Sequence, residues 1–136
     1  MRLTLLWLVI AMASLSARAE RAQPFMIVTA HPLASQAGFE VLQAGGSAVD
    51  AAIAAQMVLT LVEPQSSGIG GGAFLVHYKA GDALPEAYDG RETAPAAASP
   101  DLFLGADGQL MKWSDARIGG RSVGVPGIVR MLALAH

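Results

Sequence analysis

The amino-acid sequence predicts an α+β fold. Two consecutive helical patterns end before residue 64, and a β-hairpin pattern follows over residues 74–89. A further apolar helical pattern begins at Pro126. Helices and strands that occur in separate runs, rather than in strict alternation, are typical of this class.

The first residues of the chain predict a processing signal rather than a part of the fold. Arg2 precedes an apolar segment at residues 3–15, and residues 17–19 (ARA) resemble an A-x-A cleavage site. The apolar segment is shorter than the roughly 20 residues that cross a membrane. We therefore expect residues 1–19 to be a signal peptide, and residues 20–136 to be exported to a periplasm or the extracellular space. A retained anchor or a buried helix is the alternative.

The composition excludes several classes of function. Lys and Arg total 9 against 11 Asp and Glu, so the chain has no basic surface for nucleic acid or an anionic membrane. There is no cysteine, so an exported form relies on packing instead of disulfides. His31, His77 and His136 lack the spacing of zinc ligands. His31 instead fits a helix start, and His77 fits a strand.

The N-terminal third contains signals for a strand and a first helix. Residues 24–30 (PFMIVTA) are apolar and rich in β-branched side chains, which predicts a buried strand. Pro32 suits the first turn of a helix, because its missing N–H has no partner there. Gly45 and Gly46 supply the left-handed residue that commonly ends a helix.

A second helix is expected over residues 48–62. Ser47 and Asp50 form an S-x-x-D start signal, in which the hydroxyl accepts from a backbone N–H of the first turn. Pro64 ends the pattern. Because this segment is apolar on nearly all sides, we expect it to be buried between two layers.

The glycine-rich stretch at residues 63–74 (EPQSSGIGGGAF) contains Gly68-x-Gly70-x-x-Ala73, which satisfies the dinucleotide pattern. A true fingerprint follows a strand and opens a helix. Here a helix precedes the glycines and a strand, residues 73–78, follows. We interpret the glycines as positions where backbone approaches backbone or ligand.

The second half of the chain predicts a hairpin and a less regular region. Two strand-like runs flank a turn that contains Gly81 and Asp82. Pro85 suggests that the second strand is an edge or begins irregularly. A Pro- and Ala-rich connection follows, and a second turn at residues 105–109 (GADGQ) precedes a less regular region around Trp113. The last helical pattern reaches His136 without a stop signal, so we expect a longer protein.

Arg91 is the charged residue best suited to binding. It follows a strand and is one of few basic groups. An arginine at such a position can hold a carboxylate through two parallel N–H···O bonds. A local ion pair with Asp89 or Glu92 is the alternative. The serines that precede the glycines have no His or Asp partner and no G-x-S-x-G elbow, so we expect them to form a turn.

Three separated motifs resemble the γ-glutamyltranspeptidase (glutathione hydrolase) family: residues 29–78, residues 88–103 (YDGRETAPAAASPDLF) and residues 122–136 (SVGVPGIVRMLALAH). The resemblance implies an N-terminal-nucleophile hydrolase fold, an αββα sandwich, of which this chain is the N-terminal part. It implies a proenzyme that cleaves itself into a large and a small subunit. It implies no metal and no organic cofactor.

The implied reaction attacks the γ-glutamyl amide of glutathione or a similar compound with a threonine freed by the self-cleavage. The acyl-enzyme is then resolved by water or by an amino-acid acceptor, and an oxyanion site stabilises both stages. Thr4, Thr29, Thr60 and Thr93 are the only threonines, and none has the family's nucleophile context. We therefore expect the catalytic residue outside this chain, in the small subunit, and no activity from this chain alone.

The resemblance assigns one substrate-binding residue. The arginine of the family's RE-x-AP motif binds the α-carboxylate of the glutamyl group, and here it is Arg91 in RETAP. Glu92 is expected to support the loop, and the glycines at 70–72 a close-packed turn. Other hypotheses are an amidase of the same family that acts on a β-lactam side chain or poly-γ-glutamate, an exported carboxylate-binding protein without catalysis, and a dinucleotide-binding module.

Overall fold

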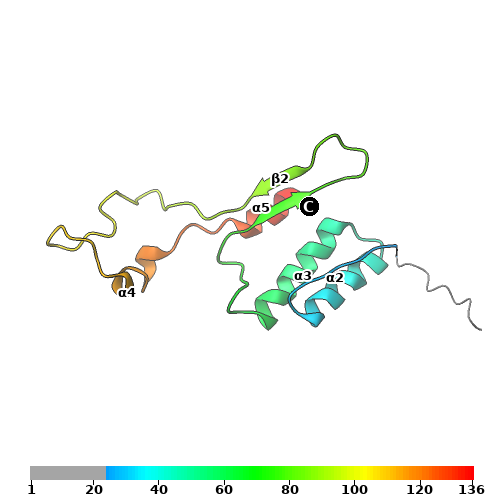
Figure 1. Cartoon of the computed structure of the whole chain (residues 1–136), viewed down its shortest axis with the longest axis horizontal. Helices are drawn as coiled ribbons and strands as arrows, with labels where there is room; N and C mark the ends of the chain where they lie inside the picture. The colour runs from blue at the N-terminus through cyan, green and yellow to red at the C-terminus, as the bar shows by residue number, and fades with distance from the viewer. Residues whose placement is uncertain (1–23) are drawn as a thin grey trace, which may run out of the picture.

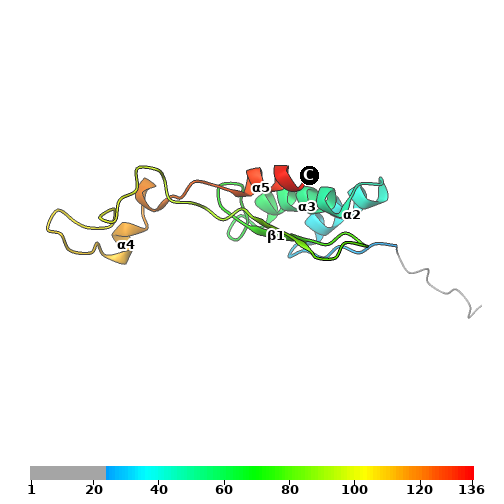
Figure 2. The same ribbon diagram turned by 90° about the horizontal axis from the view of Figure 1, so that it is seen from above.

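The computed structural model describes residues 24–136, and the predicted signal peptide lies outside the described residues. Figure 1 shows two helices side by side, a β-hairpin next to them, and an extended segment that reaches away before the chain returns. In Figure 2 the two helices and the last helix lie on one side of the hairpin. The elements are α2 (Pro32–Gln43), α3 (Ala48–Val62), β1 (Phe74–His77), β2 (Glu86–Asp89), α4 (Trp113–Ala116), a 3-10 helix (Gly120–Ser122) and α5 (Ile128–Ala135).

The first helix, α2, has the predicted start and end. Pro32 occupies its first turn, and His31 Nδ1 accepts a hydrogen bond from Leu33 N at 3.2 Å. His31 is therefore a helix cap, as its sequence position indicated. At the other end Gly45 has a φ of +90°, the left-handed conformation that favours glycine.

The second helix, α3, begins with the predicted cap by Ser47, and Asp50 adds a reciprocal bond that was not predicted. Ser47 Oγ accepts from Asp50 N at 3.1 Å, and Asp50 Oδ2 accepts from Ser47 N at 2.8 Å. These hydrogen bonds, together with His136 3.3 Å away, lower the pKa of the Asp50 carboxyl. The start of the helix is thus fixed by its own sequence.

The predicted burial of α3 between two layers is wrong for the described residues. Val49, Ala51 and Ala55 are buried, whereas Met57 and Leu61 are exposed, so the helix is not enclosed on all sides. α2 packs on the side of Ala51, where a Cβ on Gly38 would lie 2.9 Å from Ala51 O, and α5 packs on the side of Ile53, so neither helix covers Leu61. In residues 24–136, no helix is long and apolar enough to span a bilayer.

The prediction of a buried strand at residues 24–30 is also wrong. The segment is extended, with side chains that alternate between half-buried and exposed, but it pairs with no strand among the described residues. Phe25 instead packs against Phe39 of α2, with ring centroids 5.2 Å apart. An apolar alternating pattern shows that one side is buried, but it does not show whether a strand or a helix covers that side.

The hairpin is confirmed. β1 and β2 pair antiparallel, with Leu75 opposite Tyr88 and His77 opposite Glu86. His77 Nδ1 lies 3.6 Å from Glu86 Oε2, so His77 is a paired sheet residue. The side of the sheet that carries Leu75 faces the helices. The core there consists of Ile128, Met131 and Leu132 of α5, with Ile53, Ala73, Leu75 and Tyr88 packed against them.

The segment between the sheet and α5 carries more structure than its sequence suggests. We call residues 94–124 the extension. It contains the predicted turn, in which Gly105 N donates to Gln109 O at 2.8 Å, and also the four-residue helix α4 within the region expected to be irregular. The last helix begins at Ile128, two residues after Pro126, with Gly127 as its N-cap.

Candidate carboxylate-binding site

Three segments that are far apart in the sequence meet at the end of the sheet through their main chains. Gly90 N donates to Ala73 O at 2.9 Å, and Ala73 N donates to Gly90 O at 3.3 Å. One step farther, Thr93 and Val125 form an antiparallel bridge with N···O distances of 2.8 and 3.3 Å. We call this meeting point the glycine junction, and it comprises residues 71–73, 90–93 and 124–128.

Glycine is required at the junction because main chain packs on main chain. Gly127 N donates to Gly71 O at 3.1 Å, and a Cβ on Gly127 would overlap the carbonyl oxygen of Gly90. A Cβ on Gly72 would lie 2.7 Å from that same oxygen and 2.5 Å from Glu92 Oε2. Gly72 therefore serves close approach, as predicted for this stretch, whereas a Cβ on Gly70 would meet no atom of residues 24–136 within 4 Å. The order of helix, glycines and strand is that of the sequence analysis.

Arg91 belongs to the glycine junction and lies two residues after Asp89, where β2 ends. Its backbone N donates to Asp89 Oδ1 at 2.9 Å, and its Nε lies 3.5 Å from Glu92 Oε2. Both local partners considered from the sequence are thus present, one on the main chain and one on the guanidinium. The Arg91 side chain is still 70% exposed, and its terminal amino groups donate to no side chain or carbonyl of the described residues. That edge of the guanidinium matches a carboxylate.

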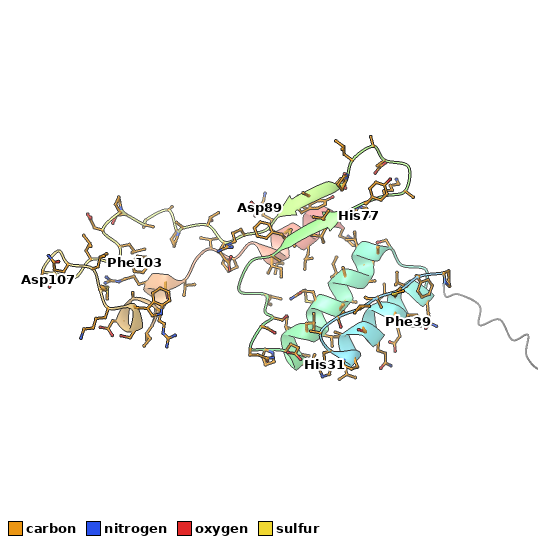
Figure 3. The ribbon with its side chains drawn as sticks, in the orientation of Figure 1. His31, Phe39, His77, Asp89, Phe103 and Asp107 are labelled. Atoms are coloured by element: carbon orange, nitrogen blue, oxygen red, sulfur yellow. The ribbon has the colours of Figure 1, made fainter. Side chains whose placement is uncertain are left out.

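An open pocket of about 350 Å³ lies beside Arg91. This volume is at the lower end of the range for small-molecule sites. Figure 3 shows Asp89 where the chain leaves β2 and Phe103 farther along the extension. The pocket is lined by Arg91, Glu92, Thr93, Ala94, Pro95, Leu102, Phe103, Arg121, Ser122, Val123 and Gly124.

Sequence reasoning missed Arg121, which lines the same pocket. The two arginines are far apart in the chain, and no local spacing connects them. The only available signal was that Arg121 immediately precedes the SVGVPG motif, whose Val125 pairs with Thr93 of the RETAP motif.

The remaining chemistry-bearing residues are not brought together. His31 lies at the start of α2 and His77 on the hairpin (Figure 3). Ser66 N and Ser67 N both donate to Glu63 O, so the serines form the predicted turn after α3. Over residues 24–136, no group of three or more His, Asp or Glu side chains is arranged to hold a metal ion.

The Gamma-glutamyltranspeptidase family profile matches residues 34–136. Over 107 residues the chain is 47% identical to the glutathione hydrolase proenzyme of Bacillus subtilis (strain 168). This match covers 79% of this chain and 18% of that protein. It is 40% identical over 110 residues to the Acylase ACY 1 proenzyme of Pseudomonas sp. (strain V22), and this match covers 77% of this chain and 20% of that protein.

A solved structure of Helicobacter pylori gamma-glutamyltranspeptidase superposes with a TM-score of 0.77 and 36% identity, over 85% of this chain and 32% of that chain. In the sequence matches, the chain spans about a fifth of the length of these curated relatives. The family match covers most of the chain, and the shared fold confirms the predicted α+β, N-terminal-nucleophile hydrolase class. This chain belongs to the gamma-glutamyltranspeptidase family.

Proposed function

We propose that this chain is the donor-binding portion of an exported glutathione hydrolase. Arg91 binds the α-carboxylate of the γ-glutamyl group. The observation that carries this proposal is the exposed guanidinium of Arg91 beside the pocket, with Nε near Glu92 and terminal amino groups that donate to no residue within 24–136. Glu92 positions that guanidinium and also neutralises part of its charge when the pocket is empty.

The chemical step belongs to residues outside this chain. Thr29 Oγ1 donates to His31 O at 2.8 Å and Thr60 Oγ1 donates to Met57 O at 2.6 Å, so both are engaged in local structure. We infer that a small subunit from the same precursor supplies the threonine nucleophile and the oxyanion donors. The acyl-enzyme then passes its glutamyl group to water or to an amino-acid acceptor.

Export is the second part of the proposal. It rests on the charged start, the short apolar segment and the ARA site of residues 1–19. N-terminal sequencing of the protein recovered from a periplasmic extract or the medium tests it. A mature N-terminus at Glu20 supports export, and recovery of the intact N-terminus from the cytoplasm contradicts it.

Acylase activity is the rival function, because one relative of similar identity is named an acylase. The two functions differ in the acyl group, since an acylase donor need not carry an α-amino acid carboxylate. Hydrolysis of a γ-glutamyl anilide and of a β-lactam side-chain amide by the same preparation separates them.

The test uses the enzyme produced from the complete gene and γ-glutamyl-p-nitroanilide as donor. Arg91→Ala removes about 3 kcal/mol of charge-assisted hydrogen bonding, so KM should rise about 100-fold. Arg91→Lys keeps the charge but loses the paired geometry, so it should recover only part of the affinity. Arg117→Ala is the control, because Arg117 is in the extension but does not line this pocket. Equal KM values for the Arg91 and Arg117 variants would overturn the assignment.

A further inference from the structure

Arg121 is held with its guanidinium at the wall of the pocket. Its Nη1 donates to Leu102 O at 3.0 Å and lies 3.2 Å from Met111 Sδ. These contacts fix one edge of the guanidinium on the turn at residues 99–104. The rest of the group stays exposed, and Arg121 lines the pocket together with Arg91.

The charges around the pocket are unequal. Among the described residues, two arginines and one carboxylate, that of Glu92, line it. Glu92 is already paired with Arg91, whereas the ion pairs found within residues 24–136 do not include Arg121. A pocket with this surplus of positive charge is suited to a ligand that carries more than one negative charge.

The two arginines also lie on opposite sides of a main-chain bridge. Thr93 and Val125 face each other in an antiparallel bridge. Arg91 lies two residues before Thr93, and Arg121 lies four residues before Val125. In an antiparallel pair the two chains run in opposite directions, so a residue before one bridge partner and a residue before the other lie on opposite sides of the bridge. One ligand carboxylate at each end is therefore a better match than a single carboxylate shared by both arginines.

We propose that Arg121 determines specificity by binding a second carboxylate of the donor, on the leaving-group side of the scissile amide. The favoured donors are γ-glutamyl peptides that end in a free carboxylate, as glutathione does. This inference rests on the proposed function, because Arg91 must hold the first carboxylate. Arg121 takes no part in bond breaking, and its contribution is to the binding of one class of donor.

The competing role for Arg121 is purely structural, since its bond to Leu102 O connects two loops of the extension. The two roles differ in one measurable respect. A loss of loop structure weakens the binding of every donor, whereas a lost carboxylate contact weakens only donors with the second carboxylate.

The experiment compares two donors in the enzyme from the complete gene. Glutathione carries a carboxylate on its leaving group, and γ-glutamyl-p-nitroanilide carries none. Arg121→Ala should raise the ratio of the glutathione KM to the anilide KM about tenfold, from the loss of a charge-assisted contact. Arg121→Lys should restore part of the ratio, because a point charge remains. Arg117→Ala, the same change four residues away, should leave the ratio at the wild-type value.

The KM ratios distinguish a carboxylate-binding role of Arg121 from a structural one. A raised ratio in Arg121→Ala, partly restored in Arg121→Lys, supports the inference. An equal rise in both KM values, or no rise, overturns it and leaves Arg121 a structural residue. If Arg121→Ala gives no folded enzyme, the ratio for Arg121→Gln, which keeps a donor for Leu102 O, decides instead. Failure of Arg91→Ala to raise either KM would refute the proposed function rather than the role of Arg121.

Discussion

The carboxylate of Glu92 occupies the space beside Gly72 that a side chain would need. A Cβ built on Gly72 lies 2.5 Å from Glu92 Oε2 and 2.9 Å from Arg91 Cα. The same carboxylate lies 3.5 Å from Arg91 Nε. Because Gly72 has no side chain, the Glu92 carboxylate can lie beside it and contact Arg91. The glycine-rich stretch and the RETAP motif therefore form one structural unit.

Gly72→Ala should displace Glu92 and the main chain at Arg91. The displaced atoms include backbone, which does not yield as a flexible side chain does, so we expect the free energy of unfolding to fall by about 1–3 kcal/mol. Thermal unfolding of the purified protein measures this. Gly70→Ala is the matched control, because a Cβ there meets no atom of residues 24–136 within 4 Å. Similar melting temperatures for the two variants would show that the close approach is unimportant.

Glu92→Gln should weaken donor binding without a large change in kcat. The ion pair with Arg91 is partly exposed and is worth no more than about 1 kcal/mol, which corresponds to up to about a fivefold rise in KM. The rise should shrink as salt is added, because salt screens exposed pairs. Glu86→Gln, which removes a carboxylate from the same hairpin beside His77, is the control. An identical rise in both variants would contradict a specific role for Glu92.

Asp50 should make stability depend on pH in the acid range. Its pKa is lowered in the folded chain by the hydrogen bonds to Ser47. The resulting stabilisation is fully present above the usual aspartate pKa of about 3.9 and is lost as the pH falls through the lowered pKa. Melting temperatures of wild type and Asp50→Asn should therefore differ most near neutral pH and converge in acid. A constant difference across this range would exclude the linkage.

Gly38→Ala should loosen the contact between α2 and α3. A Cβ on Gly38 would overlap Ile27 Cδ1 and lie 2.9 Å from Ala51 O. We expect a loss of about 1–3 kcal/mol in the free energy of unfolding. Combining Gly38→Ala with Ile27→Ala removes one of the two conflicts, so the double variant should lose less than the sum of the single losses. Strict additivity in urea unfolding would argue against this packing.

The sequence predicts best those features that depend on neighbours in the chain. The cap of α3 requires only four consecutive residues, and the Ser47 hydroxyl accepts from the first turn as expected, with Asp50 adding the reciprocal bond. The hairpin is equally local, and its strands lie where alternation and turn residues placed them. Helix α4 was missed because four residues are too few to show a helical period.

Features that depend on distant partners were not predictable. The apolar pattern of residues 24–30 is that of a strand, but its partner is a helix, as the contact of Phe25 with Phe39 shows. The sequence offered Arg91 as a candidate, whereas Arg121 entered the pocket only through the Thr93–Val125 bridge. A pairing between segments so far apart leaves no period or spacing in a single sequence.

The bridge between Thr93 and Val125 also bears on the order in which the chain folds. The α2–α3 pair and the hairpin each join residues close in sequence, so their chain-closure entropy is small and they can form early. The bridge and the bond from Gly127 to Gly71 close much longer loops. The pocket is therefore one of the last parts to be completed, and a slow step in refolding should show itself as delayed ligand binding rather than delayed helix formation.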